Sequence, residues 1–245
     1  MRVDWEALAQ PAEANANGQM VGMPAAWQGA SHPPRSLLTG QYCRVEPLSQ
    51  ERHGAQLFDE LHKMPGGANW TYLSHGPFSH LEDWQQWMAA NAALDDPQFY
   101  AIVDGHDGEA IGLCSYLRIA PADGSIEVGF LNFSPRLQRS RLATEAMYLM
   151  MRNAFELGYR RYEWKCDAQN APSVQAALRL GFTFEGLFRQ ARVNKGRNRD
   201  TAWFSILDHE WPVRRAALEA WLDEGNFDAD GRQRASLAKI VAAQS

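Results

Sequence analysis

Apolar and polar residues alternate along several stretches of the chain, which is the pattern of β-strands with one buried face. The clearest stretches are QYCRVEP (41–47), QFYAIVD (98–104), AIGLCSYLRI (110–119), SIEVGFLNF (125–133), YRRYEWKCD (159–167), FTFEGLFRQARV (182–193) and TAWFSIL (201–207). The second, third and fourth are joined by GHDGE and APADGS, and such Asp-Gly connections are typical of hairpins. These three stretches are therefore predicted to form an antiparallel meander. Alternation along 125–133 places Glu127, Gly129 and Leu131 on one face and Ile126, Val128 and Phe130 on the other.

Other segments place apolar residues every three or four positions, which is the period of an amphipathic helix. The pattern predicts helices over 50–63, 79–94, 138–157, 170–180, 212–223 and 232–243. Ser79 and Asn170 are candidate N-caps, while Gly158 and Gly181 are placed to end two of the helices.

The order of these elements, β-α-α-βββ-α-β-α-ββ, predicts an α/β (α+β) fold with a mixed, largely antiparallel central sheet flanked by helices. Residues 1–38 are rich in Pro, Gly, Ala and Asn and show little periodicity, so we expect an irregular N-terminal arm. Residues 39–209 form the expected core domain, and 210–245 form a helical C-terminal extension.

Composition excludes several classes of protein. The net charge of −5 over 245 residues argues against general nucleic-acid binding. The apolar runs are shorter than the roughly 20 residues that span a bilayer, and the N-terminus lacks the apolar core of a secretory signal, so we expect a cytoplasmic protein with no membrane partner. Cys43, Cys114 and Cys166 are widely separated, which argues against a disulfide framework and against a metal site.

The passage from the strand 125–133 into the helix 138–157 has the form of an anion-binding turn. The first N–H groups of a helix lack partners and, with the helix dipole, favour a phosphate. Gln138 to Ala143 occupy this turn, and Arg139 and Arg141 add positive charge. A solvated basic first turn explains the same residues, and the spacing alone leaves both interpretations open.

A second helix start lies at NAPSVQAALRLGF (170–182). Asn170 and Ser173 are three positions apart and share a face of this helix. Asn170 could simply cap the helix, with Pro172 in the first turn where its missing N–H does no harm.

These segments together resemble the GNAT superfamily of acyltransferases. Gln138-Arg139-Ser140-Arg141-Leu142-Ala143 resembles the family's acetyl-CoA motif, Gln/Arg-x-x-Gly-x-Gly/Ala, and ATEA (143–146) resembles the helix start of its RimJ/RimL branch. The asparagine, the small residue three positions later and the closing Gly-Phe of 170–182 resemble the family's second motif. The resemblance extends from about Tyr42 to Leu207. Arg141 departs from the usual glycine, and Ala177 stands where many members carry a tyrosine as proton donor.

The resemblance implies direct transfer of an acetyl group from acetyl-CoA to a primary amine, on a protein N-terminus or a small molecule. It assigns to cofactor binding Leu131, Phe133, Gln138, Arg139, Ser140, Arg141, Leu142, Ala143, Thr144, Asn170 and Ser173. Since position 177 is alanine, Ser173 also becomes a candidate proton donor. The alternative is a non-catalytic acyl-CoA-binding module with a regulatory role.

Glu127 is the candidate general base, because it is a lone acid on the strand that leads to the phosphate turn and the family often has glutamate there. Pairing with Arg118 on the neighbouring strand is the alternative.

The loop 70–78 resembles the acceptor-side loop of the RimJ/RimL branch, which implies an acceptor pocket at Trp70, Tyr72 and His75, although core packing explains such aromatic residues equally well. KGRNRD (195–200) is interpreted as a solvated turn, and binding of an acidic acceptor is the alternative. The sequence leaves open whether the protein forms a homodimer.

Overall fold

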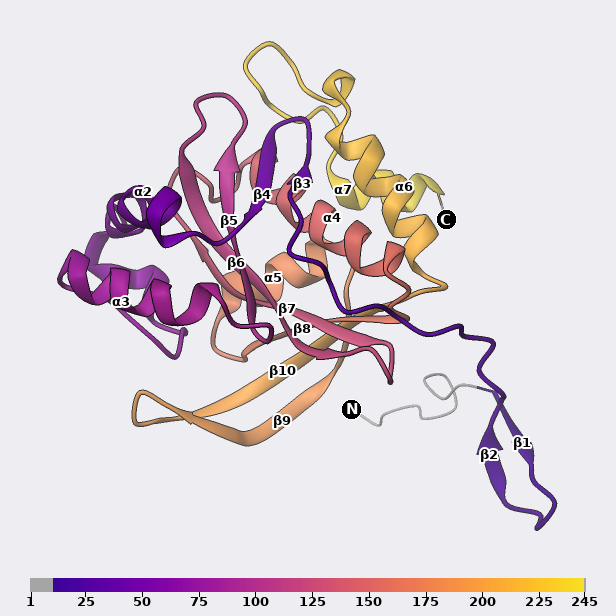
Figure 1. Ribbon diagram of the computed structural model, residues 1–245. Helices are drawn as coiled ribbons and strands as arrows, with labels where there is room; N and C mark the ends of the chain where they lie inside the picture. Colours follow the sequence, from indigo (N-terminus) through magenta and orange to yellow (C-terminus); the bar gives the residue numbers. More distant parts are fainter. Residues whose placement is uncertain (1–10, 245) are drawn as a thin grey trace.

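An eight-stranded sheet forms the centre of the molecule (Figure 1). The computed structural model describes residues 11–244. In spatial order the strands are β3 (Leu38–Thr39), β4 (Cys43–Pro47), β5 (Gln98–Asp104), β6 (Ala110–Ala120), β7 (Ser125–Phe133), β8 (Arg161–Asp167), β10 (Arg197–Leu207) and β9 (Thr183–Asn194). The β7–β8 pair is parallel and the other neighbours are antiparallel. The predicted fold class is thereby confirmed.

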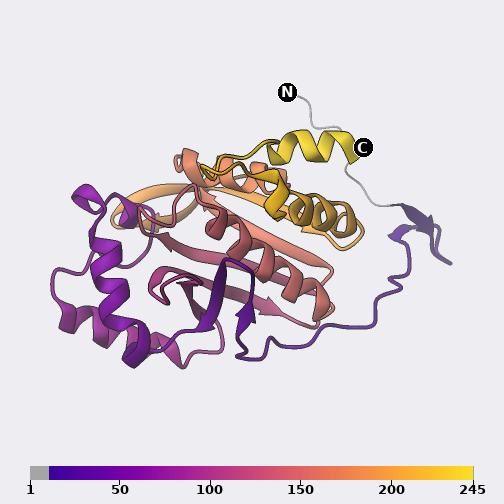
Figure 2. The same ribbon diagram turned by 90° about the horizontal axis from the view of Figure 1, so that it is seen from above.

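Helices cover both faces of this sheet, as Figure 2 shows from above. One face carries α2 (Gln50–His62), the 3-10 turn η1 (Pro65–Trp70) and α3 (Leu81–Ala92). The other carries α4 (Arg141–Glu156), α5 (Ala171–Arg179) and α6 (Trp211–Leu222), followed by the turn η2 (Glu224–Asn226) and α7 (Leu237–Gln244), which packs against α6.

The two faces of the sheet belong to two apolar cores. The larger core joins the sheet to α4, α5 and α6, and includes Tyr116, Ile126, Val128 and Tyr162. The smaller core joins the sheet to α2 and α3. Since side chains alternate along a strand, Glu127 lies on the face of the smaller core.

Some element boundaries differ from the sequence-based expectation. Helix α3 begins at Leu81 after His80, so the expected N-cap at Ser79 is wrong. Helix α4 begins at Arg141 rather than Gln138, because Ser140 supplies the capping hydroxyl. The turn between β9 and β10 is also shorter than expected, since β10 already begins at Arg197.

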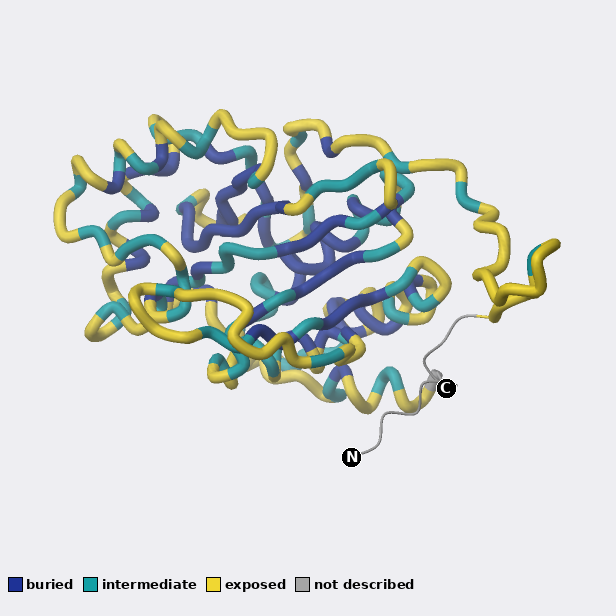
Figure 3. The backbone as a smooth tube through the Cα atoms, turned by 90° about the horizontal axis from the view of Figure 1, so that it is seen from below, coloured by how far each residue is buried: buried dark blue, intermediate teal, exposed yellow. Residues whose placement is uncertain are grey.

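The N-terminal arm contains a hairpin that its composition did not suggest. β1 (Ala12–Ala14) pairs antiparallel with β2 (Met20–Gly22), and the Asn15 side chain accepts hydrogen bonds from two backbone N–H groups inside the turn. Figure 1 shows this hairpin projecting from the body, and Figure 3 shows that the projecting part is largely exposed. Residues 1–10 of the expected arm, and Ser245 of the expected extension, lie outside the described residues.

Candidate active site

The parallel strands β7 and β8 separate halfway along their length. Their pairing runs from Ser125–Arg161 to Val128–Trp164 and stops there, although β7 continues to Phe133. Beyond this point the β8-facing edge of β7 is left without its neighbouring strand. Such an edge offers backbone donors and acceptors to an extended ligand that contains amides.

A β-bulge lies where the strands separate. The register of β7 with β6 shifts between Gly129 and Asn132, and Phe130 has a φ of 49°. The bulge turns Phe130 into the smaller core, while Leu131 and Phe133 pack against the larger one. Strict alternation predicted Leu131 on the face of Glu127 and Phe130 on the opposite face, and this prediction was wrong because the bulge inverts the order.

A side-chain cap closes the turn that leads into α4. The Ser140 hydroxyl accepts a hydrogen bond from the N–H of Ala143, at 3.1 Å. Arg139 takes the positive φ of the turn, 57°, while Arg141 is already helical. Glycine is therefore not required at position 141. Within residues 11–244, the N–H groups of Arg141 and Leu142 have no hydrogen-bond acceptor, so both remain available to an anion.

The guanidinium of Arg141 lies in an aromatic stack instead of extending freely from the turn. Its carbon is 4.6 Å from the ring centre of Tyr42 and 3.5 Å from that of Phe227, a residue of the C-terminal extension. Two other assigned residues are also held in place: the Gln138 amide donates to the carbonyl of Phe133 at 2.9 Å, and Thr144 accepts from Arg179 at 3.1 Å.

The second motif caps α5. The Asn170 side-chain oxygen accepts from the N–H of Ser173 at 3.3 Å, which is the capping geometry considered from the sequence. Ser173 in turn accepts from the indole nitrogen of Trp164 at 3.0 Å. Burial raises the pKa of the neighbouring Cys166 thiol, and a hydrogen bond with the Ser173 hydroxyl acts in the opposite direction. Trp164 forms the last pair between β7 and β8, so Ser173 lies beside the point where the strands separate.

Glu127 lies at the base of this opening and is 2% exposed. Its two oxygens accept from Arg118 at 2.6 Å each, the pairing considered as the alternative, and Lys165 approaches one of them at 3.1 Å. Burial raises the pKa of Glu127 above its ordinary value, while Arg118 and Lys165 act in the opposite direction. The protonation state of the Glu127 carboxyl therefore depends on the positions of Arg118 and Lys165.

The loop after η1 packs around aromatic rings on the same face of the sheet. Trp70 is 1% exposed and lies in the smaller core, in edge contact with the rings of His75 and Phe78. His75 stacks on Trp87 with ring centres 4.4 Å apart, and burial lowers the pKa of His75 to about 4. The Tyr72 hydroxyl donates to the carbonyl of Gln169 at 3.0 Å. Trp70 is therefore core, whereas Tyr72 and His75 are half-buried.

The β9–β10 hairpin reaches this loop, a contact that the sequence did not predict. The Lys195 ammonium donates to the carbonyl of Trp70 at 2.7 Å, and the Asn194 amide donates to that of Tyr72 at 3.4 Å. The sequence does contain the cations of this hairpin, in KGRNRD (195–200). Whether the hairpin reaches the loop depends on how far β9 and β10 extend, which the sequence did not predict. The hairpin contacts the loop on the face of the sheet that carries Glu127.

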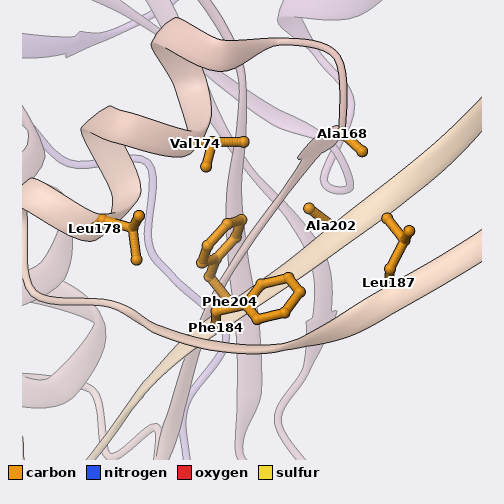
Figure 4. A pocket seen from close by; sticks show the side chains of 7 residues that line it. All are labelled: Ala168, Val174, Leu178, Phe184, Leu187, Ala202 and Phe204. Atoms are coloured by element: carbon orange, nitrogen blue, oxygen red, sulfur yellow. The ribbon is translucent and has the colours of Figure 1, made fainter. Parts of the chain in front are cut away.

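An apolar pocket lies on the opposite face of the sheet, between α5 and the β9–β10 hairpin (Figure 4). Its lining consists of Ala168, Val174, Leu178, Phe184, Leu187, Ala202 and Phe204. These side chains carry no group for acid-base chemistry, and the pocket is separate from the opening beside Glu127.

Across 11–244, no helix is long and apolar enough to cross a membrane. Over the same range, no cluster of three or more His, Cys, Asp or Glu side chains is arranged to hold a metal ion.

Comparison with known proteins agrees with this architecture. Residues 45–183 match the acetyltransferase (GNAT) domain. The crystal structure of a GCN5-related N-acetyltransferase from Brucella melitensis is 42% identical and superposes with a TM-score of 0.86, covering 89% of this chain and 99% of that one.

Two curated relatives are similar over shorter stretches. The uncharacterized N-acetyltransferase p20 of Bacillus licheniformis is 30% identical over 144 residues, which are 57% of this chain and 80% of the relative. The ribosomal-protein-serine acetyltransferase of Escherichia coli (strain K12) is 33% identical over 86 residues, 35% of this chain and 48% of that protein. With the GNAT domain matched over more than half of its length, and with the family's sheet and helices in place, the chain belongs to the GNAT family of acetyltransferases.

Proposed function

We propose that the protein is an acetyl-CoA-dependent N-acetyltransferase of RimJ/RimL type, which moves an acetyl group directly to a primary amine on a protein N-terminus or a small molecule. One observation carries the proposal: the strands separate beyond Val128 and Trp164, with the free start of α4 beside the opening and a buried carboxyl at its base. The partial similarity to a ribosomal-protein-serine acetyltransferase supports the branch.

The chain's own groups fit acetyl-CoA. The unpaired N–H groups of Arg141 and Leu142 suit its pyrophosphate, and the uncovered edge of β7, including Leu131 and Phe133, suits its amide-containing arm. The Asn170 side chain caps α5 through its oxygen, which leaves its amide nitrogen to donate to the same arm. When bound, acetyl-CoA supplies an activated thioester carbonyl.

Glu127 is the proposed general base. An ammonium must lose a proton before its nitrogen can attack a carbonyl, and a carboxylate whose pKa is raised by burial accepts that proton more readily. Arg118 and Lys165 hold the two oxygens in a fixed position and balance the negative charge before transfer. Backbone N–H groups of β7 around 130–133 would polarise the carbonyl. Ser173 Oγ–H would give a proton to the sulfur as the carbon–sulfur bond breaks, and the hydroxyl would regain one from the attacking nitrogen, which loses its second proton as the amide forms.

The test measures CoA thiol released from acetyl-CoA against a panel of peptides, amino acids and polyamines. Glu127→Gln is expected to lower kcat by roughly 10²- to 10⁴-fold while leaving acetyl-CoA affinity unchanged. It should also abolish the rise of kcat/KM with pH that Glu127 deprotonation produces. Glu163→Gln is the matched control, because Glu163 is another buried acid of the same ion network, 2.6 Å from Lys165. No CoA release with any amine would refute the transferase function.

A non-catalytic acyl-CoA-binding module is the second candidate. Two features favour it: Ala177 replaces the family's usual tyrosine, and the carboxylate of Glu127 is fully engaged by Arg118 and Lys165. This function predicts that acetyl-CoA raises Tm by mass action in the wild type and in Glu127→Gln alike, with no thiol release in either.

A further inference from the structure

The β9–β10 hairpin carries more positive charge than its surroundings balance. Its cations are Arg189, Arg192, Lys195, Arg197 and Arg199. None of the four arginines takes part in an ion pair within residues 11–244. The single acid of the hairpin's distal half, Asp200, accepts instead from the N–H of Gln190 at 2.7 Å and from the Asn198 amide at 3.0 Å.

Two of these arginines are placed against one another. Arg199 lies directly opposite Arg192 in the β9–β10 ladder, and like charges at such positions repel. Arg199 is half-buried, and its Nε is fully buried with no hydrogen-bond partner in the described part of the chain. Burial lowers the pKa of Arg199, attraction from the Asp167 carboxylate raises it, and repulsion from Arg192 lowers it again. Asp167 forms no ion pair with Arg199 in the described part of the chain, and a buried guanidinium N–H without an acceptor is costly in a folded protein, which indicates that a ligand supplies the missing acceptor.

The same strand presents two more donors without partners. Thr201 and Trp203 follow Arg199 at intervals of two along β10, so the three side chains share one face of the sheet. Thr201 Oγ1 and Trp203 Nε1 are both buried, and neither has a partner within residues 11–244. Arginine Nε, threonine hydroxyl and indole N–H can all donate, so this row would suit a ligand rich in acceptors.

This face of β10 is also the face of the proposed base. The Lys165 ammonium lies 3.7 Å from the ring centre of Trp203 and 3.1 Å from Glu127, so Trp203 and Glu127 flank the same cation. Attraction from Glu127 is also among the influences on the pKa of Arg199. A molecule whose amine is close to Glu127 can therefore reach Arg199 with a neighbouring group.

We infer that the acceptor carries an oxyanion, a carboxylate or a phosphate, close to its reactive amine, and that Arg199 and Thr201 bind this oxyanion while Arg192 adds charge. The inference rests on the proposed acetyl transfer and narrows its substrate class to anionic amines. Arginine binds carboxylate and phosphate through paired N–H groups, and either anion would relieve the repulsion between Arg192 and Arg199.

The first test compares matched amines. Dipeptides with aspartate or glutamate after the N-terminal residue are compared with their asparagine or glutamine analogues, and an aminoalkyl phosphate is compared with its alcohol. The wild type is expected to favour the anionic member by roughly 10- to 100-fold in kcat/KM. The relative rates of the carboxylate and phosphate arms show which oxyanion is preferred. Equal or faster turnover of the neutral members would overturn the inference and leave acetyl transfer intact.

Two variants test whether Arg199 causes the preference for anionic amines. Arg199→Gln should bring the anionic-to-neutral ratio close to one, whereas Arg197→Gln, which removes an exposed cation near the tip of the same hairpin, should keep the ratio of the wild type. Thermal unfolding of both variants checks that the fold is retained. An unchanged ratio in Arg199→Gln contradicts the inference.

A binding measurement remains decisive even if no amine is acetylated. Succinate and inorganic phosphate, compared with chloride at equal ionic strength, should raise Tm in the wild type and in Arg197→Gln, and clearly less in Arg199→Gln, where only the start of α4 is left to bind an anion. An absent rise in the wild type, or an equal rise in all three proteins, overturns the anion site whatever the outcome for the transferase function.

Discussion

Glu145 lies inside helix α4 with its carboxylate against three successive backbone N–H groups, those of Gln41, Tyr42 and Cys43, each at 2.7 Å. The side chain is buried and holds the turn between β3 and β4 onto the helix. Glu145→Gln would replace an acceptor of three N–H groups with a neutral amide, so we expect it to lower the free energy of unfolding by about 2–4 kcal/mol. The same change at exposed Glu156, on the same helix, should cost less than about 0.5 kcal/mol in urea unfolding. Equal losses would contradict the role given to Glu145.

His75 predicts a dependence of stability on pH. Its folded pKa of about 4 lies below the ordinary value of 6.5, because burial disfavours the charged ring. The unfolded chain therefore binds more protons between pH 6.5 and 4, and folding stability falls as pH falls through this window, by about 1–3 kcal/mol from this residue. His75→Phe keeps a ring to stack on Trp87 but cannot titrate. Urea unfolding at pH 6.5, 5.5 and 4.5 should give a shallower loss for the variant, and identical slopes would exclude His75 as the cause.

Single residues were predictable from the sequence where the argument needed only local spacing. Asn170 caps its helix, and Glu127 lies on the face given by alternation from Ile126 and Val128. Phe130 was misplaced because a bulge inverts the alternation, and no residue type marks this bulge. Arg199 was assigned to a turn because its segment is polar, yet the ladder with β9 extends past it.

The start of α4 links three parts of the chain through one side chain. Arg141 lies between Tyr42, at the β3–β4 turn, and Phe227, in the C-terminal extension. Arg141→Gly would restore the residue usual in the family motif, but it removes this stack and places glycine in the first turn of the helix. We expect a loss of about 1–2 kcal/mol in the free energy of unfolding.

The same variant tests whether the arginine obstructs the cofactor. Position 141 is helical and Arg139 takes the positive φ, so glycine offers no backbone advantage there. Acetyl-CoA affinity, measured by equilibrium dialysis, should therefore not increase in Arg141→Gly. An affinity at least tenfold tighter would show that the guanidinium blocks the pyrophosphate site. Arg141→Lys, which keeps the charge but not the planar stack, separates the two contributions.

Most elements were predictable because hydrophobic period and turn residues agreed. The meander of β5, β6 and β7 followed from alternation and its Asp-Gly turns, and α4 followed from its long helical period ended by Gly158. The hairpin of β1 and β2 was missed because its strands have three residues each and all six are exposed. A strand with no buried face shows no alternation of apolar and polar residues. The separation of β7 from β8 could not be predicted, since it depends on which residues of two distant segments face one another.

At the scale of the whole molecule, the two extensions make very different contributions to the larger core. The C-terminal extension places in that core Trp211, Ala217, Leu218, Trp221, Leu222 and Leu237. Burial of each large apolar side chain contributes about 1.5–3 kcal/mol, so together they are worth about as much as the net stability of a typical domain. The arm is attached mainly through residues after its hairpin: the Trp27 indole donates to the carbonyl of Gly158 at 2.8 Å, and the N–H of Ser31 donates to that of Leu157 at 2.9 Å.

Two truncations should therefore behave in opposite ways. A chain that ends at residue 209 leaves the outer surface of α4 uncovered, including Tyr148 and Phe155, which stack on Trp211, and it should show no cooperative thermal unfolding by circular dichroism. A chain that begins at residue 25 keeps the Trp27 and Ser31 anchors, and its Tm should lie within about 2 °C of the full chain. Trp27→Ala in the full chain is the matched control, since it leaves the hairpin but removes the anchor, and it should lower Tm more than the deletion does. Cooperative unfolding of the chain ending at 209 would mean that the sheet with α4 and α5 is stable alone, and that the C-terminal extension covers a core that is already complete.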